Sequence, residues 1–166
     1  MVIFTFDRNF YRLFDEQQQI EELDSRFYNT LSAMLTPAYP EPMSVSGLPP
    51  YDPQNIFARI LRGEIPCKAV LDTEHALAFH DINPLTPTHI LVIPKGEWVS
   101  AADFHVGAEP AAIVGFWRAV AQIGQPLAAG GYRILSNMGP DAGQEVPHFH
   151  VHVFGGQPLG PMLKRG

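Results

Sequence analysis

Hydrophobic and polar residues alternate most strictly near the C-terminal end of the chain, over residues 148–154. Histidine occupies every second position from His148 to His152, and apolar residues stand between. A period of two is typical of a β-strand, on which alternate side chains point to the same face. The pattern therefore predicts a strand with three imidazoles on one face and apolar side chains in a core.

Weaker patterns predict the rest of an α+β body. Pro53 and Gly63 are expected to bracket a short helix, since proline favours first turns and glycine follows last ones. A longer helix is expected to open at Glu109-Pro110. The predicted buried stripe of that helix is Ile113, Val114, Trp117, Val120, Ala121 and Gly124. Further strands are expected at residues 68–72, 75–81, 89–94 and 131–137. Their short connections favour an antiparallel sheet with helices packed on it.

The first fifty residues differ from this body. Apolar residues at spacings of three and four between Ile20 and Leu35 predict an amphipathic helix, and a proline-rich linker follows it. We therefore divide the chain into an N-terminal extension, residues 1–50, and a main domain, residues 51–166. Three interpretations of the extension stay open. It attaches a second subunit or a regulator, or it is an appended helix that covers the body or a partly ordered tail. In the third, translation begins at Met43 and the first 42 residues are not part of the protein.

The composition limits the classes of function. The chain has 166 residues, a hydrophobic fraction of 46% and a net charge of −6, which fits one compact domain and argues against general nucleic-acid binding. The single cysteine, Cys67, permits no disulfide within the chain, which favours a reducing compartment. No apolar run is long enough to span a membrane, and the N-terminus does not resemble a signal peptide. We therefore expect a cytoplasmic protein.

Three interpretations of the histidine row stay open at this point: a polar stripe facing solvent, a zinc site, or a catalytic centre. Zinc is disfavoured, because an extended strand places His148 and His152 roughly 13 Å apart. In a catalytic centre, a neutral His150 would attack phosphorus, provided that a backbone carbonyl holds the proton on its other ring nitrogen. His152 would donate to a phosphoryl oxygen or protonate the leaving group.

A turn-rich loop, residues 137–144, precedes the histidine row. Two glycines and Pro140 allow it to bend sharply and to bring the backbone close to a ligand. The backbone N–H groups of such a loop can bind an anion. An ordinary connection between strands is the alternative, but the position directly before the histidines favours a phosphate site.

Several segments resemble the histidine triad (HIT) superfamily, whose signature is His-x-His-x-His-x-x with apolar residues at x. Residues 143–154 match this signature, residues 55–66 look like the opening helix of the family, and residues 78–84 and 87–95 look like its nucleotide pocket. The resemblance implies an α+β fold, with a five-stranded antiparallel sheet and two helices, that usually forms a homodimer with a continuous sheet. It also implies that neither a cofactor nor a metal is required.

The same resemblance assigns roles to individual residues. It implies that His150 is the nucleophile that becomes nucleotidylated, that His152 contacts the phosphate or leaving group, and that His148 and His89 complete the histidine network. Asp81 matches the carboxylate that holds the ribose hydroxyls, although by itself it is more typical of a turn at the end of a strand. The other implied substrate-binding residues are Ile56, Phe57, Phe79, His80 and Ile82 around the purine, and Asn137, Gly143, Gln144 and Glu145 near the phosphate.

Two residues bear on the branch of the family. Asn137 resembles the Hint branch of purine nucleoside phosphoramidases, whereas the Fhit branch of dinucleoside polyphosphate hydrolases carries glutamine there. Glu145 departs from both branches, which commonly have serine or threonine. We therefore predict an enzyme that hydrolyses the P–N bond of AMP-amine conjugates. The alternatives are a dinucleoside polyphosphate hydrolase, a nucleotidyltransferase, or a nucleotide-binding interaction module.

Overall fold

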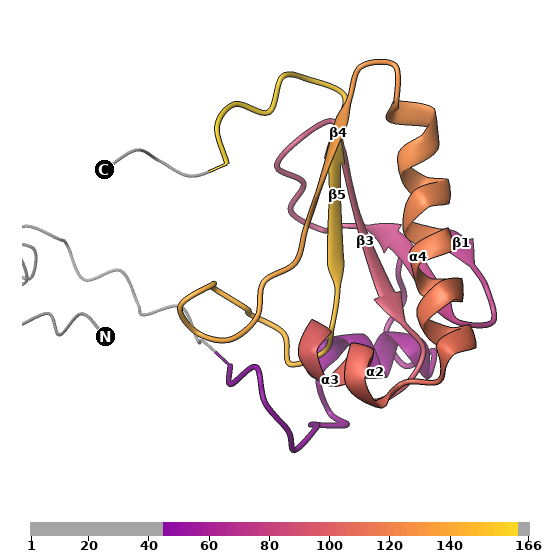
Figure 1. The fold of residues 1–166 in the computed structure, drawn as a ribbon, viewed down its shortest axis with the longest axis vertical. Helices are drawn as coiled ribbons and strands as arrows, with labels where there is room; N and C mark the ends of the chain where they lie inside the picture. The colour runs from indigo at the N-terminus through magenta and orange to yellow at the C-terminus, as the bar shows by residue number, and fades with distance from the viewer. Residues whose placement is uncertain (1–44, 163–166) are drawn as a thin grey trace, which may run out of the picture. The chain divides into compact units, whose positions relative to one another are not determined.

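The computed structural model describes residues 45–162, which form a single antiparallel sheet with helices against it (Figure 1). The sheet has five strands in the order β1-β2-β3-β5-β4, and every neighbouring pair is antiparallel. The strands are β1 (Ala69–Asp72), β2 (Ala76–His80), β3 (Thr88–Pro94), β4 (Tyr132–Leu135) and β5 (Val151–Gly155). The predicted fold class is confirmed. The predicted N-terminal helix lies outside the described residues.

The helices are α2 (Ile56–Leu61), α3 (Ala101–Gly107) and α4 (Pro110–Gly124), followed by the short 3-10 helix η1 (Gln125–Leu127). The predicted short helix is present as α2, but it begins after Asn55, whose side-chain oxygen accepts from the N–H groups of Phe57 and Ala58. The additional helix α3 was not among the predicted elements. Its signal in the sequence is a capping pair, in which the Asp103 carboxylate accepts from the Ser100 N–H at 2.8 Å.

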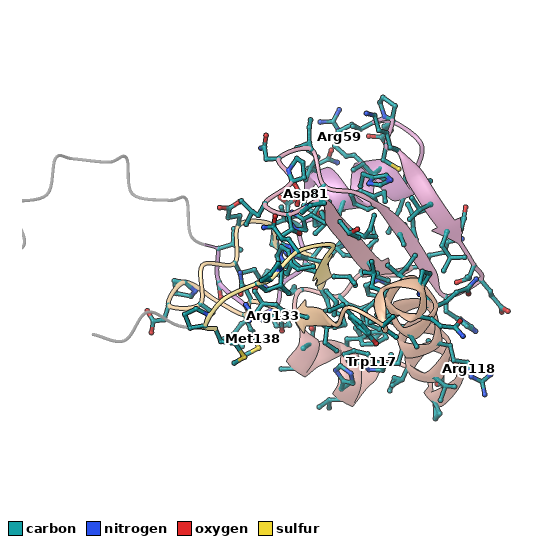
Figure 2. The ribbon with its side chains drawn as sticks, turned by 90° about the horizontal axis from the view of Figure 1, so that it is seen from above. Arg59, Asp81, Trp117, Arg118, Arg133 and Met138 are labelled. Atoms are coloured by element: carbon teal, nitrogen blue, oxygen red, sulfur yellow. The ribbon has the colours of Figure 1, made fainter. Side chains whose placement is uncertain are left out.

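The sheet separates two groups of buried residues. Helix α4 contacts β2, β3 and β5 over one face. Figure 2 shows Asp81 and Trp117 on opposite sides of the sheet. The larger core, under α3 and α4, includes Phe104, Phe116, Val120, Phe149, Val151 and Val153. The smaller core, beside α2, consists of Phe57, Leu77, Phe79, Leu91 and Ile93. None of the helices in residues 45–162 has the length and hydrophobicity needed to cross a bilayer.

The predicted stripe of α4 is correct only in part. Val120 and Gly124 are buried, whereas Val114, Trp117 and Ala121 are exposed. The stripe that faces the sheet instead contains Phe116, whose ring packs against two other phenylalanines of the core at centroid distances of 5.3 and 5.0 Å. A large aromatic ring dominates the burial of a helix face, so Phe116 determines which side of α4 turns inward.

The predicted strand at residues 148–154 begins later than expected, at Val151. The two residues before it have partners outside the strand ladder: the Phe149 N–H donates to the Trp98 carbonyl, and the Ser136 hydroxyl donates to the His150 carbonyl. The alternation of side chains nevertheless continues through this segment. Phe149, Val151 and Val153 are all buried in the α4 core. The histidines therefore lie on the α2 face, as the alternation predicts.

Candidate active site

Four imidazoles gather on the α2 face, where β3 and β5 pair. His89 lies on β3 and His152 on β5, while His148 and His150 lie in the segment that enters β5. The side chains of His89, His148 and His150 are buried, and that of His152 is half-buried. The ring centroids of His150 and His152 are 4.9 Å apart. The structure thus brings together the four predicted catalytic histidines.

His150 presents a free lone pair to the site. Its Nδ1 lies 2.7 Å from the backbone carbonyl oxygen of His148. A carbonyl only accepts hydrogen bonds, so Nδ1 carries the proton and Nε2 carries the lone pair. Burial lowers the pKa of His150, which keeps the ring neutral near pH 7. The expected hydrogen bond from the His150 ring to a backbone carbonyl is present, and it leaves Nε2 of His150 able to act as a nucleophile.

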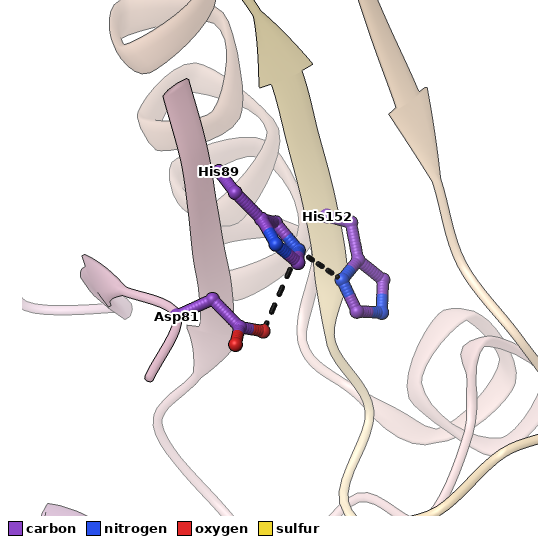
Figure 3. Close-up of side chains that lie close together, drawn as sticks. All are labelled: Asp81, His89 and His152. Carbon is purple, nitrogen blue, oxygen red and sulfur yellow. Dashed lines mark hydrogen bonds and ion pairs between the residues drawn. The ribbon is translucent and has the colours of Figure 1, made fainter. Parts of the chain in front are cut away.

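His152 presents the opposite group, an N–H. The backbone N–H of Leu85 donates to His89 Nδ1 at 3.3 Å, so the proton of neutral His89 lies on Nε2. His89 Nε2 is 2.9 Å from His152 Nδ1, which must accept (Figure 3). Burial, followed by the neighbouring His150 and His89, lowers the pKa of His152 to about 4. Neutral His152 therefore carries its proton on Nε2, where it can be donated to a ligand.

Asp81 is both a turn residue and a neighbour of the histidines. It directly follows β2, and its Oδ1 accepts from the Asn83 N–H at 2.7 Å. Its Oδ2 lies 3.4 Å from His89 Nε2. Figure 3 shows that Asp81 and His152 approach His89 from two sides. The structure therefore places this carboxylate next to the histidine pair, while its contact with a ribose stays a prediction.

The residues predicted to surround a purine divide into two groups. Phe57 and Phe79 are buried and pack edge to face at 5.6 Å, and the Phe57 ring also lies 5.2 Å from that of His150. His80 is exposed at the end of β2. Ile56 and Ile82 are 48% and 91% exposed. The exposed isoleucines offer apolar surface to a ligand. The two phenylalanines are instead part of the buried core beside the histidines.

The structure buries the side chain of Gln144, one of the predicted substrate-binding residues. Its side chain is 1% exposed and bonds only within the protein: Oε1 accepts from the Gly139 N–H, and Nε2 donates to the carbonyls of Val99 and Val146. A side chain satisfied in this way is not offered to a substrate. Gln144 instead holds the loop in the shape that leads the chain into His148.

The other predicted loop residues are accessible. Asn137 is half-buried, and Gly143 and Glu145 are exposed. Gly143 has a φ of +69°, a backbone conformation that favours glycine. The negative charge of Glu145 acts on His150 to raise its pKa, in opposition to the larger effect of burial. Glu145 is therefore close enough to influence the nucleophile electrostatically.

Two polar residues of the site were not predicted. The Tyr51 hydroxyl lies 2.6 Å from His148 Nδ1, although the two residues are 97 positions apart. The Ser136 hydroxyl bonds the His150 carbonyl at 2.8 Å. Neither belongs to a periodic pattern in the sequence. Only the adjacency of Ser136 to the predicted loop could have indicated its position.

One group of side chains has the composition of a metal site. Asp81, His89 and His152 each place one potential ligand atom within 4.8 Å of the others. Two of these contacts already join the residues to one another, at 2.9 and 3.4 Å. The cluster is thus satisfied without an ion, and independence from metal stays a prediction.

Sequence and structure comparisons with known proteins point to the same family. The HIT domain model matches residues 62–159. An uncharacterised HIT-like protein of Azospirillum brasilense is 65% identical over 118 residues, which cover 70% of this chain and 97% of the relative. The purine nucleoside phosphoramidase of Escherichia coli is 42% identical over 113 residues, covering 66% and 93%. A HIT family hydrolase from Clostridium thermocellum has a similar structure, with 30% identity, coverage of 67% and 97%, and a TM-score of 0.61.

Proposed function

The chain belongs to the HIT domain family, and from this premise we propose that it hydrolyses the P–N bond of purine nucleoside 5′-phosphoramidates through a nucleotidylated His150. The observation that carries the proposal is the pairing of two neutral imidazoles of opposite polarity. His150 offers a lone pair at Nε2, and His152 beside it offers an N–H. The similarity to a purine nucleoside phosphoramidase supports the choice of substrate class.

In the first step, the lone pair of His150 Nε2 attacks phosphorus. The P–Nε2 bond forms and the bond from phosphorus to the amine breaks. The amine keeps the electron pair of the broken bond and takes a proton from solvent. The His150 ring becomes positively charged, and the His148 carbonyl that accepts from its Nδ1 stabilises this charge. The N–H of His152 donates to a phosphoryl oxygen as negative charge develops there.

In the second step, water attacks the phosphorus atom of the nucleotidylated histidine. The P–Nε2 bond breaks, its electron pair returns to His150, and the proton of the water passes to solvent. AMP is released and the enzyme returns to its starting state. Dividing one displacement into two easier ones is the general advantage of a covalent nucleophile.

The nucleoside portion would bind beside the histidines. We assign Asp81 to the ribose, because a carboxylate accepts from two hydroxyl groups and its Oδ2 points toward the histidine pair. We assign the exposed Ile56 and Ile82 to the faces of the purine, where covering them would remove apolar surface from water. The nucleotide is thus proposed as a small-molecule ligand, bound without a metal or another cofactor.

The test is intact-protein mass spectrometry after brief incubation with adenosine 5′-phosphoramidate, with AMP measured alongside. Wild-type protein is expected to release AMP and to carry a transient AMP adduct. His150→Ala is expected to lose both, with a fall in rate of at least about a thousandfold, because the nucleophile is absent. The matched control is His105→Ala, which removes an exposed histidine from α3 and is expected to retain activity.

The outcomes separate the alternatives. Cleavage of a dinucleoside polyphosphate without cleavage of the phosphoramidate would replace the proposal with the alternative hydrolase. Nucleotide binding without turnover would favour an interaction module. An adduct that persists in His150→Ala would show that another residue is the nucleophile.

A further inference from the structure

We propose that Tyr51 is a positioning residue for the nucleophile, acting through His148. The inference rests on the proposed function of His150, and it concerns a residue outside the range that the family model matches, residues 62–159. The Tyr51 hydroxyl is 2.6 Å from His148 Nδ1, and the His148 carbonyl is 2.7 Å from His150 Nδ1. Two hydrogen bonds, joined by the covalent bonds of His148, therefore connect Tyr51 to the attacking ring.

The direction of these hydrogen bonds follows from the carbonyl of Pro94. This oxygen lies 3.1 Å from His148 Nε2 and can only accept, so His148 carries a proton at Nε2. The burial of His148 lowers its pKa to about 4, so the ring is neutral near pH 7 and has no second proton. Nδ1 must therefore accept, and the Tyr51 hydroxyl must donate. Burial raises the pKa of Tyr51, which keeps that hydroxyl protonated.

Both nitrogens of the His148 ring are thus fixed by partners from distant parts of the chain. The side chain is 0% exposed, so Nδ1 would lose its partner without gaining access to bulk water. A ring that shifted to recover a hydrogen bond would move the peptide to which it is attached. That peptide carries the oxygen that orients His150. The hydroxyl of Tyr51 therefore contributes to the direction in which His150 Nε2 points.

The segment that carries Tyr51 is itself held on both sides. Before Tyr51, the Val45 N–H donates to the Gln144 carbonyl, and Gly47 lies so near the loop that an added Cβ would stand 2.7 Å from the Gly139 nitrogen. After Tyr51, the Asn55 side chain donates to the Asp52 carbonyl at 2.6 Å. Residues 45–55 thus follow a defined path between the turn-rich loop, residues 137–144, and α2. The placement of Tyr51 is part of the packed structure.

The test compares wild-type protein with Tyr51→Phe, which removes only the hydroxyl. We expect kcat for adenosine 5′-phosphoramidate to fall about tenfold while KM changes less than about twofold, because misorientation of the nucleophile affects the chemical step more than binding. Tyr132→Phe is the matched control. Tyr132 pairs with Gly155 at one end of β4, whereas Leu135 at the other end pairs with His152. Loss of the Tyr132 hydroxyl should therefore leave kcat unchanged.

Imidazole nitrogen NMR gives a second measurement that needs no substrate. In wild-type protein we expect His148 to be protonated at Nε2, with Nδ1 showing the shift of a hydrogen-bonded acceptor. In Tyr51→Phe the Nδ1 signal should move to the value of a free acceptor, and the His150 signals should move with it. Wild-type His148 protonated at Nδ1 would overturn the proposal even if the variant did not fold.

The two measurements keep the proposals distinct. If wild-type protein cleaves the phosphoramidate but Tyr51→Phe leaves kcat and the His150 signals unchanged, Tyr51 has no positioning role and the proposed function stands. If wild-type protein does not cleave it but the His148 and His150 signals change together in the variant, the positioning chain stands and the proposed substrate is wrong.

Discussion

Glu145 places an exposed carboxylate near a site that is proposed to bind an anion. Its side chain is exposed, and its charge acts on His150 to raise the pKa of that ring. A carboxylate repels a phosphate leaving group and attracts an amine that leaves as an ammonium ion. We therefore infer that Glu145 favours amine leaving groups over phosphate ones.

Glu145→Ser is expected to lower the ratio of phosphoramidate to dinucleoside polyphosphate cleavage about fivefold, since an exposed charge pair is worth about 1 kcal/mol. The measurement is kcat/KM for one substrate of each kind, at low and high salt. Asp141→Ser is the control, because it removes a negative charge from an exposed position in the loop that directly precedes Glu145. An unchanged ratio in Glu145→Ser would show that this carboxylate does not select the leaving group.

Individual side chains show what could be predicted at this scale. The gathering of the four histidines follows from alternation in one segment and from the family resemblance. Gln144 was assigned to the substrate because it stands in the signature, yet its amide is used by Gly139, Val99 and Val146. Val99 is 45 positions from Gln144, and Tyr51 is 97 positions from His148. Contacts at such separations leave no local pattern, which is why both were missed.

At the scale of elements, periodicity predicted existence better than boundaries. The alternating segment keeps its apolar residues in the core, but a strand ladder forms only from Val151, since Phe149 pairs with Trp98 instead. Helix α4 was placed correctly from Glu109-Pro110, yet its buried face was rotated in the prediction. Helix α4 has apolar residues on two adjacent sides, and the periodic pattern fits either side equally well. Only the packing of Phe116 against the core shows which side is buried.

We propose that this chain forms a homodimer and that β4 is its interface. β4 is an edge strand, and Ile134 and Leu135 on it are 45% and 42% exposed. An edge strand that has no neighbour within residues 45–162 and carries apolar side chains is a template for pairing with a second copy of the same strand. Ile134→Lys is therefore expected to convert a dimer into a monomer, because a charged residue on an edge opposes pairing. Light scattering during size-exclusion chromatography measures the change.

The opposite edge of the sheet provides the control. Val70 lies on β1 and is 43% exposed, so Val70→Lys places the same charge on an edge strand of similar exposure. We expect this variant to stay dimeric. A wild-type monomer, or a dimer that survives Ile134→Lys but not Val70→Lys, would contradict the assignment of the interface to β4.

At the scale of the whole molecule, the site couples folding to pH. His148 is completely buried and its pKa falls to about 4, below the 6.5 of an unperturbed histidine. The unfolded chain therefore binds a proton between these pH values that the folded protein does not bind. Protonation favours the state that accepts the proton. The free energy of unfolding therefore falls as the pH decreases from 6.5 to 4, and it increases as the pH is raised from 4 to 6.5.

For His148 alone, this loss amounts to about 3 kcal/mol across the interval, at 1.36 kcal/mol for each pKa unit. Urea unfolding measured from pH 7 to pH 4 should show the decrease in wild-type protein, and His148→Gln should show a shallower one because that titration is removed. His105→Gln is the control, since it replaces an exposed histidine of α3 with the same residue. A slope that His148→Gln leaves unchanged would mean that folding does not lower the pKa of His148, and that the buried ring binds its proton over the same pH range as in the unfolded chain. The pH dependence of the stability therefore tests the lowered pKa of the buried His148 ring, which is the ring that the proposed positioning of His150 needs in its neutral form.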